Sequence, residues 1–301
     1  MAAQLLDGNK VAEKIKSELM KEIGEIKGRN VVPSLTAVQV GENPASAVYV
    51  NNQKKSCEEM GISYKLEQLP ESINESDLLK FIEKLNNDKK VNGIILQMPL
   101  PAGIDARNVQ KTISPEKDVE GMNPANMGML VYGKPNLAPC TALGAVELLK
   151  SSGVDLKGKE VTIVGHSEIV GKPIALMLLA SMTESPTPTV CHVATKDLAF
   201  HTRRADILIV AVGKAGLIKG DMIKEGAIVI DIGINRVAML DAAGKPVLNE
   251  KGVAKKVTVG DVVFDEAVKK AAFISPVPGG VGPLTVMMLI SNTVKACKLQ
   301  Q

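Results

Sequence analysis

Short apolar runs rich in β-branched residues alternate, over most of the chain, with longer stretches that carry apolar residues at helical spacing. This alternation is typical of βαβ units, in which parallel strands are joined by helices that cover the sheet. The pattern predicts strands at residues 35–40, 62–69, 93–98, 161–165, 190–193, 206–212, 227–233 and 257–263. We therefore expect an α/β protein built on parallel sheets.

Boundary signals place helices between these strands. Asn43 and Pro44 are an N-cap residue followed by a proline at the first helical position, and Gly61 follows the end of the same helix. Residues 74–86 carry leucine and isoleucine side chains at the spacing of one helix face, which predicts an amphipathic helix.

The second half of the chain repeats the same alternation after a break. Residues 121–140 are rich in Gly, Pro and Asn and are expected to form a crossing segment, after which Thr141 is expected to cap a linker helix. Residues 182–189 are expected to form a polar loop, and residues 284–298 an apolar closing helix. A chain of 301 residues is long enough for two domains with separate cores.

Composition excludes several classes of protein. The 36 basic and 33 acidic residues form no charged tail, and aromatic residues make up only 2%, so we expect no nucleic-acid partner. No apolar stretch reaches the length of a membrane span, and the first residues lack the apolar core of a secretory signal. We therefore expect no membrane association and a cytoplasmic location.

Cysteine and histidine spacing gives no sign of a metal centre. The four cysteines lie far apart without a CxxC pair, and the three histidines show no ligand spacing. Free cysteines suit a reducing compartment, so we expect neither a disulfide framework nor a bound metal.

Residues 161–173 (VTIVGHSEIVGKP) are predicted to form a strand, a tight turn and the start of a helix. Gly165, Ser167 and Gly171 are small residues that let backbone N–H groups and a helix N-terminus approach a pyrophosphate. The same pattern also occurs in ordinary strand–helix connections. An acidic residue near the end of the next strand would mark ribose recognition for NAD, but residues 190–195 (VCHVAT) hold no carboxylate, so this pattern favours neither NAD nor NADP.

In the N-terminal half, the strands at 35–40 and 93–98 are expected to open onto one crevice at their carboxyl ends. Gln97 lies at one of these ends. Tyr49 and Gln53 lie four residues apart on the helix after the first strand, so their side chains are neighbours. Spacing alone favours a half-buried structural tyrosine and a solvated glutamine.

Taken together, a series of segments resembles the methylenetetrahydrofolate dehydrogenase/cyclohydrolase family over nearly the whole chain. The segments are VGENPASAVYV, GIILQMPLP, PEKDVEG, NPANMGML, PCTALGAVELL, VGHSEIVGKP, ADILIVAVGK, KEGAIVIDIGIN, VGDVVF and SPVPGGVGPLTV. They occur in the family's order with similar spacing, and the last is highly specific.

The resemblance implies a fold and an activity. It implies an N-terminal α/β folate domain (residues 1–140 plus 281–301) and a C-terminal Rossmann-type domain with a parallel sheet (residues 141–280), the C-terminal helix returning to the first domain. It also implies a homodimer that acts on tetrahydrofolate one-carbon derivatives. The dehydrogenase step passes a hydride from 5,10-methylenetetrahydrofolate to NAD(P), and the cyclohydrolase step hydrolyses 5,10-methenyltetrahydrofolate.

The resemblance also assigns roles to residues and none to a metal ligand. It places Tyr49 and Gln53 at catalytic positions, with Tyr49 packed on the folate rings. Substrate binding is assigned to Tyr49, Gln97, Asp118, Glu120, Pro276, Pro278, Gly279 and Gly280. Dinucleotide binding is assigned to Gly165, His166, Ser167, Ile169, Val170, Val193, Gly213 and Ile234.

Four positions depart from the family pattern. Gln53 stands where the family has its active-site lysine, and the lysines that follow it directly point to other faces of the helix. Glu120 replaces the second aspartate of an Asp-Val-Asp-Gly segment. His166 replaces a common arginine, and Val193 replaces a common serine.

These departures predict a changed enzyme. Hydride loss from the methylene bridge needs positioning only, whereas hydrolysis needs a group that gains and loses a proton, which a glutamine amide cannot do. We therefore expect a dehydrogenase with weak or absent cyclohydrolase activity. Loss of donors beside the adenosine ribose predicts NAD in preference to NADP, although NADP use stays open. The alternatives are the ordinary bifunctional enzyme and a non-catalytic paralogue that binds folate or dinucleotide.

Overall fold

The computed structural model describes residues 3–42, 44–241 and 244–301, and these form two compact units. The six-stranded unit, named for its main sheet, contains the described residues up to 11 together with residues 145–284. The three-stranded unit contains the described residues of 12–144 together with 285–301. The chain passes between the units inside three helices, α1 (Gly8–Lys27), α6 (Cys140–Lys150) and α10 (Val281–Leu299).

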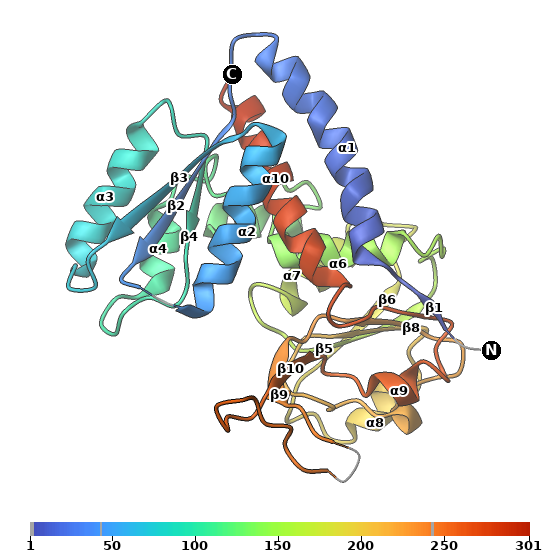
Figure 1. Ribbon diagram of the computed structural model, residues 1–301. Helices are drawn as coiled ribbons and strands as arrows, with labels where there is room; N and C mark the ends of the chain where they lie inside the picture. Colours follow the sequence, from blue (N-terminus) through green and yellow to red (C-terminus); the bar gives the residue numbers. More distant parts are fainter. Residues whose placement is uncertain (1–2, 43, 242–243) are drawn as a thin grey trace. The chain divides into compact units, whose positions relative to one another are not determined.

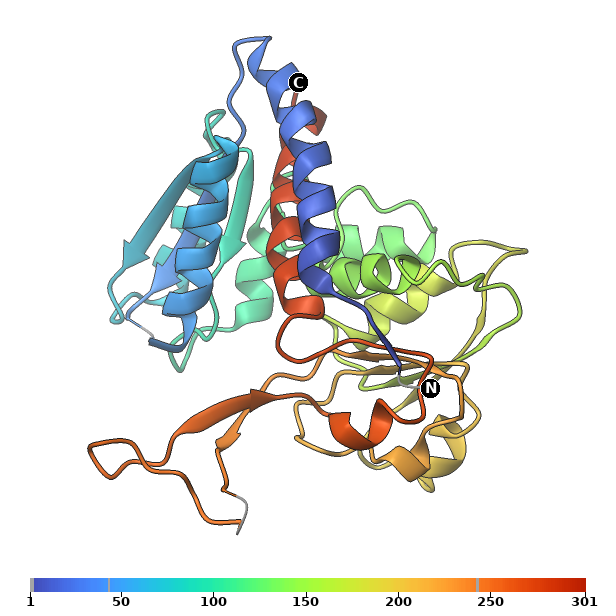
Figure 2. The same cartoon turned by 45° about the vertical axis from the view of Figure 1, so that its right-hand side comes forward.

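The three-stranded unit is built on a parallel sheet in the order β3-β2-β4 (Figure 1). Its strands are β2 (Ser34–Val40), β3 (Ser63–Leu69) and β4 (Gly93–Leu96). Its further helices are α2 (Pro44–Met60), α3 (Glu75–Asn87), α4 (Ala106–Thr112) and α5 (Pro124–Val131). In this unit the last turns of α10 run beside α1, and Lys298 Nζ lies 2.6 Å from a carboxylate oxygen of Glu22 (Figures 1 and 2).

Helix α3 shows why these residues fold as they do. The Asn74 side chain caps it by accepting a hydrogen bond from the Asp77 backbone N–H at 2.9 Å. Helical spacing then turns Leu78 and Ile82 toward the sheet, where both are fully buried in a core that includes Val38. Burial of this apolar surface is the main favourable contribution to folding, and it holds the strand ends that carry the site.

The six-stranded unit is an all-parallel sheet in the order β1-β11-β8-β7-β5-β6. Its strands are β1 (Gln4–Leu5), β5 (Glu160–Val164), β6 (Thr187–Cys191), β7 (Ile207–Val210), β8 (Ile228–Asp231) and β11 (Phe273–Ile274). Around it lie α7 (Gly171–Leu178), α8 (Leu198–Thr202), α9 (Phe264–Ala267) and the 3₁₀ turn η1 (Gly220–Met222). Strands β7 and β8 are buried on both faces, which explains their unbroken apolar runs.

One predicted strand belongs to a different sheet. The run 257–263 was expected to join the parallel sheet, but β10 (Lys256–Val259) pairs antiparallel with β9 (Asn235–Ala238) in a two-stranded sheet of its own. The expectation is wrong because a short apolar run does not specify its partner. The strand is only partly buried, so its apolar residues do not report a core position.

A second strand begins earlier than predicted. The prediction placed a strand at 190–193 and a loop at 182–189, whereas β6 takes in the last residues of that loop. Pro188 made this part look irregular. Because β6 is the edge strand of the sheet, a residue without a backbone N–H is tolerated there.

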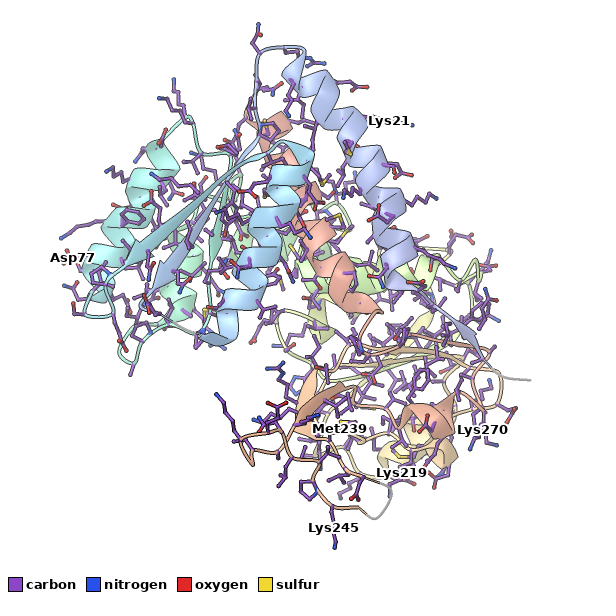
Figure 3. The ribbon with its side chains drawn as sticks, in the orientation of Figure 1. Lys21, Asp77, Lys219, Met239, Lys245 and Lys270 are labelled. Atoms are coloured by element: carbon purple, nitrogen blue, oxygen red, sulfur yellow. The ribbon has the colours of Figure 1, made fainter. Side chains whose placement is uncertain are left out.

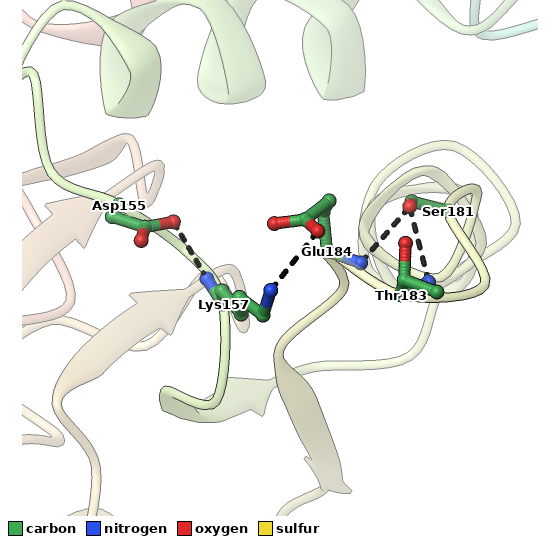
Figure 4. Close-up of polar contacts among 5 residues, drawn as sticks. All are labelled: Asp155, Lys157, Ser181, Thr183 and Glu184. Carbon is green, nitrogen blue, oxygen red and sulfur yellow. Dashed lines mark hydrogen bonds and ion pairs between the residues drawn. The ribbon is translucent and has the colours of Figure 1, made fainter.

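The remainder of that loop is held by local polar contacts (Figure 4). Ser181 Oγ accepts hydrogen bonds from the backbone N–H groups of Thr183 and Glu184 at 3.3 and 3.0 Å. Lys157 Nζ lies 3.1 Å from a Glu184 carboxylate oxygen, and the Lys157 backbone N–H donates to Asp155 at 3.0 Å. The segment that precedes β6 is therefore tied to the segment that precedes β5.

The short helices α4 and α5 were not predicted from the sequence patterns. Helix α4 is capped by Asp105, and α5, inside the predicted crossing segment 121–140, is capped by Asn123. Thr141 is wrong as a cap, since it lies in the first turn of α6. The predicted cap Asn43 lies outside the described residues.

The unit boundaries differ from the expected ones at both ends. The first residues join the six-stranded unit because Gln4 and Leu5 of β1 pair with Phe273 and Ile274 of β11. The other two boundaries fall four residues later than expected, inside α6 and α10. Among the helices of the described residues, none is both long and apolar enough to cross a bilayer.

Candidate functional site

A cavity of about 240 Å³ opens at the carboxyl end of the sheet in the three-stranded unit. Three of the predicted substrate residues line it: Tyr49 from α2, Gln97 from the end of β4, and Glu120 from the segment after α4. Its remaining walls are Ser46, Ile95, Leu96 and Met98. Parallel strands that end at one edge explain why residues far apart in sequence meet here.

Gln53 lies one helical turn after Tyr49 and is fully buried, so the alternative of a solvated glutamine is wrong. Its Oε1 accepts hydrogen bonds from Gln97 Nε2 at 3.0 Å and from the Tyr64 hydroxyl at 3.4 Å. Its Nε2 has no hydrogen-bond partner among the described residues, which is unusual for a buried amide. Lys54 and Lys55 are exposed and face Glu58 and Glu59, as the helical spacing predicts.

The phenol of Tyr49 lies in a poorly solvated position. Burial raises its pKa far above the usual value, and the neighbouring Cys140 and Glu120 raise the pKa further, whereas the Gln53 amide acts in the opposite direction. Tyr49 is therefore neutral at physiological pH. It presents an aromatic face and a hydroxyl to the cavity, and it is not a base.

Glu120 is the acidic side chain of the cavity. Burial raises its pKa to about 8, and the nearby Asp118 carboxylate adds to the effect. Among the described residues no side chain or backbone N–H donates to it at hydrogen-bond distance. At neutral pH the carboxyl of the free protein is thus mostly protonated, and once it loses that proton it has open positions for a ligand's donors.

Asp118, also predicted to bind substrate, is bonded within its own loop. It does not line the cavity, and its carboxylate accepts from the backbone N–H groups of Gly121 and Asn123 and from Asn126 Nδ2, at 3.1, 2.6 and 2.9 Å. Burial raises its pKa despite these bonds. These hydrogen bonds fix the loop that carries Glu120.

The loop is also held from α10, by a residue that sequence patterns did not single out. Asn292 Nδ2 donates to the backbone carbonyls of Val119 and Ala138 at 2.8 and 2.9 Å and is fully buried. The Cys140 thiol donates to the Val119 carbonyl at 3.2 Å. An asparagine within the mostly apolar stretch of this helix was the available signal.

The six-stranded unit carries a second group of predicted residues at one edge of its sheet. Gly165 directly follows β5, Val193 lies two residues after β6, and Gly213 and Ile234 lie three residues after β7 and β8. Pro276 lies two residues after β11. All these strands are parallel neighbours, so their carboxyl ends form a single edge, which is the usual place for a ligand in such sheets.

The first turn of this sheet admits glycine only. Gly165 has φ +113°, and a Cβ on it would lie 2.1 Å from the Ala211 carbonyl oxygen. A Cβ on Gly171 would lie 1.9 Å from the Gly165 carbonyl oxygen. Helix α7 therefore starts tight against the end of β5, which is the cradle that a dinucleotide pyrophosphate requires.

The two residues that replace the family's arginine and serine, His166 and Val193, carry no permanent positive charge. His166 and His192 are exposed and lie edge to face, with ring centroids 5.1 Å apart. Val193 is 69% exposed and offers no donor. Lys172, a candidate to replace the missing arginine, lies 3.4 Å from a Glu168 carboxylate oxygen. Ser167 and Ile169 are exposed at the same turn, and Val170 is partly buried there.

Pro276, Pro278, Gly279 and Gly280 lie in the segment between β11 and α10 of the six-stranded unit. A Cβ on Gly8 would lie 1.7 Å from the Gly280 carbonyl oxygen, so the start of α1 packs directly on this segment. Within the described residues no group of three or more His, Cys, Asp or Glu side chains has the arrangement of a metal site.

Known protein families match both units of the chain. Residues 6–120 match the model of the tetrahydrofolate dehydrogenase/cyclohydrolase catalytic domain, and residues 139–301 match the model of its NAD(P)-binding domain. The chain is 49% identical over 298 residues to the bifunctional protein FolD of Moorella thermoacetica, covering 99% of this chain and 100% of that one. The chain belongs to the tetrahydrofolate dehydrogenase/cyclohydrolase family.

Solved structures of the family agree in fold. The bifunctional enzyme FolD from Campylobacter jejuni, a methylenetetrahydrofolate dehydrogenase/cyclohydrolase, superposes with a TM-score of 0.90 at 44% identity over the whole of both chains. The Trypanosoma brucei dehydrogenase-cyclohydrolase, solved with NADP and an inhibitor, superposes with a TM-score of 0.89 at 37% identity, covering 99% of this chain and 98% of that one. The expected two-unit α/β fold of the family is confirmed, including the C-terminal helix that returns to the three-stranded unit.

Proposed function

We propose that this chain oxidises 5,10-methylenetetrahydrofolate to 5,10-methenyltetrahydrofolate by hydride transfer to NAD or NADP. The observation that carries the proposal is the meeting of Tyr49, Gln97 and Glu120 around one cavity. An aromatic face, an amide and a carboxyl with open positions suit a flat ring system with an edge of hydrogen-bond donors. Family membership supports this choice of ligand over other planar molecules.

Each residue has a task that its surroundings allow. The Glu120 carboxylate accepts from two N–H donors on the pterin edge, because no protein donor occupies it. Tyr49 stacks on the ring as a neutral phenol, and Gln97 contributes an amide that its bond to Gln53 keeps in place. Asp118 and Asn292 hold the loop that carries Glu120.

The glycine cradle of Gly165 and Gly171 fits a dinucleotide, and Gly213, Ile234 and residues 276–280 would flank its nicotinamide end. When bound, this cofactor accepts the hydride. Oxidation of the methylene bridge removes a hydride and leaves a cation stabilised by the folate nitrogens. No proton is transferred in this step, so residues that position the carbon suffice.

We propose that the hydrolytic step is weak. Attack by water on the methenyl carbon must release a proton, and a ring nitrogen must gain one as its bond to that carbon breaks. A fully buried glutamine amide cannot carry that proton, so Gln53 removes the titratable group of this position.

The ordinary bifunctional enzyme is the second candidate, and two observations favour it. The Moorella thermoacetica relative, 49% identical to this chain, is named a bifunctional protein. Glu120, with its pKa of about 8, is a titratable group in the same cavity. If Glu120 transfers the proton, hydrolysis survives without the lysine. The comparison of rates at the end of the Discussion separates the two candidates.

For the cofactor we propose NAD in preference to NADP. A 2′-phosphate is held best by a guanidinium or by several donors, and the turn offers exposed His166 and Val193 instead. The Trypanosoma brucei relative was solved with NADP, so its residues at this turn are the natural reference for substitution.

We also propose that the chain acts as a homodimer in the cytoplasm. The two-stranded sheet of β9 and β10, together with the chain that joins these strands, forms an arm with exposed apolar side chains. The exposed fractions of Met239, Leu240, Leu248 and Val253 are 45–60%, and Figure 3 labels Met239. An apolar arm of this kind is suited to a second copy of the chain. The four cysteines are free and buried, in keeping with a reducing compartment. Sedimentation equilibrium would test the dimer.

The dehydrogenase is tested by following the absorbance of reduced nicotinamide when 5,10-methylenetetrahydrofolate is added with NAD or NADP. We expect steady turnover that depends on both substrates. Binding of folate and dinucleotide without turnover would contradict the proposal and favour a non-catalytic paralogue.

A further inference from the structure

Two buried aspartates connect the loops at the carboxyl edge of the six-stranded sheet. Asp261 is fully buried, and its Oδ2 accepts from the backbone N–H groups of Val212 and Gly213 at 2.7 and 2.9 Å. Its Oδ1 accepts from Asn235 Nδ2 at 2.8 Å. One carboxylate thus joins the loop that follows β7 to the loop that follows β8.

Asp231, the last residue of β8, extends this network to the next strand. Its Oδ1 accepts from the backbone N–H groups of Gly233 and Asp261, each at 3.0 Å, and its Oδ2 accepts from that of Val262 at 2.9 Å. Its own backbone N–H donates to Ser275 Oγ at 2.7 Å, directly before the segment 276–280. The Asp231–Asp261 network therefore reaches the ends of β7, β8 and β11.

The surrounding backbone is shaped to fit these carboxylates. A Cβ on Gly233 would lie 2.2 Å from the Asp261 carboxyl carbon, and a Cβ on Gly260 would lie 1.8 Å from Asp231 Oδ2. Neither carboxylate has a Lys or Arg partner among the described residues. Burial of two acidic groups is costly unless their hydrogen bonds are filled, and here the partners are loop N–H groups and one amide.

We infer that Asp261 is a positioning residue for the nicotinamide end of the cofactor, because it fixes the Val212–Gly213 turn against Asn235 and, through Asp231, against the segment that begins at Pro276. The inference rests on the proposed function, which places Gly213, Ile234 and Pro276 beside the nicotinamide. The hydride acceptor must be held about 3–3.5 Å from the donor carbon in the correct orientation, and displaced loops would lose that alignment.

The test compares Asp261→Ala with Asp261→Asn and a matched control. Asp261→Ala leaves two loop N–H groups without an acceptor, whereas Asp261→Asn keeps one oxygen for them and lets the Asn235 amide turn to pair with the new one. The control is Asp206→Ala, at the amino edge of the same sheet, where the carboxylate accepts from the Glu160 backbone N–H at 3.0 Å. Each variant is assayed for dinucleotide KM, kcat, folate affinity and Tm.

We expect Asp261→Ala to raise the dinucleotide KM roughly tenfold to a hundredfold and to lower kcat, with folate affinity within about twofold of the parent. Asp261→Asn should restore most of the dinucleotide KM and most of kcat to the parent values. Asp206→Ala should change only Tm. If Asp261→Ala does not fold, Asn235→Ala removes only one of the three bonds and should shift KM in the same direction by less. A lower Tm with unchanged KM and kcat would overturn the inference.

Failure of the proposed function gives a different pattern. A parent chain without dehydrogenase activity would refute the proposed function. The role of Asp261 would then be tested by measuring the affinity for reduced nicotinamide dinucleotide, using the fluorescence of that dinucleotide. Weaker binding by Asp261→Ala than by Asp206→Ala would support it. Equal binding by both variants, or no binding by the parent, would overturn it.

Discussion

Glu120 and Asp261 are acidic side chains beside strand ends, one in each unit, but their surroundings differ. Asp261 accepts three hydrogen bonds from the protein at 2.7–2.9 Å, so its oxygens are occupied. Glu120 accepts none from the described residues and has a pKa of about 8. A carboxylate whose partners the protein supplies fixes backbone, whereas one without partners is ready for a ligand's donors.

Gln53 belongs with Glu120 in this comparison, since its Nε2 is buried without a partner. Changing it gives the largest expected effect. Gln53→Lys should raise the hydrolysis of methenyltetrahydrofolate by roughly 100-fold to 10,000-fold, because it supplies a group that carries a proton. Release of 10-formyltetrahydrofolate, corrected for spontaneous hydrolysis, measures the change. Gln53→Leu, which adds no titratable group, is the control, and an equal gain in both variants would contradict the reason given.

Removing the open carboxyl gives the next largest effect. Glu120→Ala should weaken folate binding tenfold to over a hundredfold, because a charged hydrogen-bonding partner is lost at a cost of roughly 1.5–3 kcal/mol. Equilibrium binding of folate measures this directly. Glu116→Ala removes an exposed neighbour and should leave the affinity unchanged. Unchanged affinity in Glu120→Ala would exclude Glu120 from the site.

The pH dependence of folate binding should follow the Glu120 carboxyl. Its pKa of about 8 lies above the usual value, so the free site holds a proton below pH 8, and that proton must leave before the carboxylate can accept two donors. Folate affinity should therefore rise with pH by up to about tenfold per unit and level off near pH 8. Glu120→Gln should abolish this slope. A slope that persists in that variant would assign it to another group.

The smallest expected effect concerns recognition of the 2′-phosphate of NADP. His166→Arg adds an exposed guanidinium beside the adenosine end of the cradle, and exposed charge pairs contribute little. We expect kcat/KM for NADP to rise by about fivefold at most, with kcat/KM for NAD unchanged. His201→Arg, on α8, is the control. A parent chain that prefers NADP tenfold would contradict the proposed preference for NAD.

Much of the fold was predictable because local signals and the global fold agree. Helix α3 carries its own cap and a buried face. Strand β7 is apolar throughout and β8 is apolar up to its last residue, because both faces of these strands are buried. Strand β10 was misassigned because its pairing with β9 depends on a turn and a partner outside the run itself.

The site was predictable only in part, because many of its contacts join residues that lie far apart in the sequence. The family resemblance assigned Tyr49 and Gln97 to the substrate site, where helix spacing alone favoured a structural tyrosine, and both line the cavity. Burial of Gln53 and occupation of Asp118 depend on partners from other elements, which a single sequence does not show. The Asp231–Asp261 network joins residues about 30 positions apart through backbone groups, so no pattern of residue types predicts it.

The central claim is that one cavity oxidises the methylene bridge well and hydrolyses the methenyl product poorly. The most direct test starts the parent enzyme with 5,10-methylenetetrahydrofolate and NAD and follows reduced nicotinamide together with methenyltetrahydrofolate. Accumulation of methenyltetrahydrofolate in step with reduced nicotinamide, until it is lost at its spontaneous rate, is the predicted result. Its removal as fast as it forms, with 10-formyltetrahydrofolate as the main product, would contradict the account.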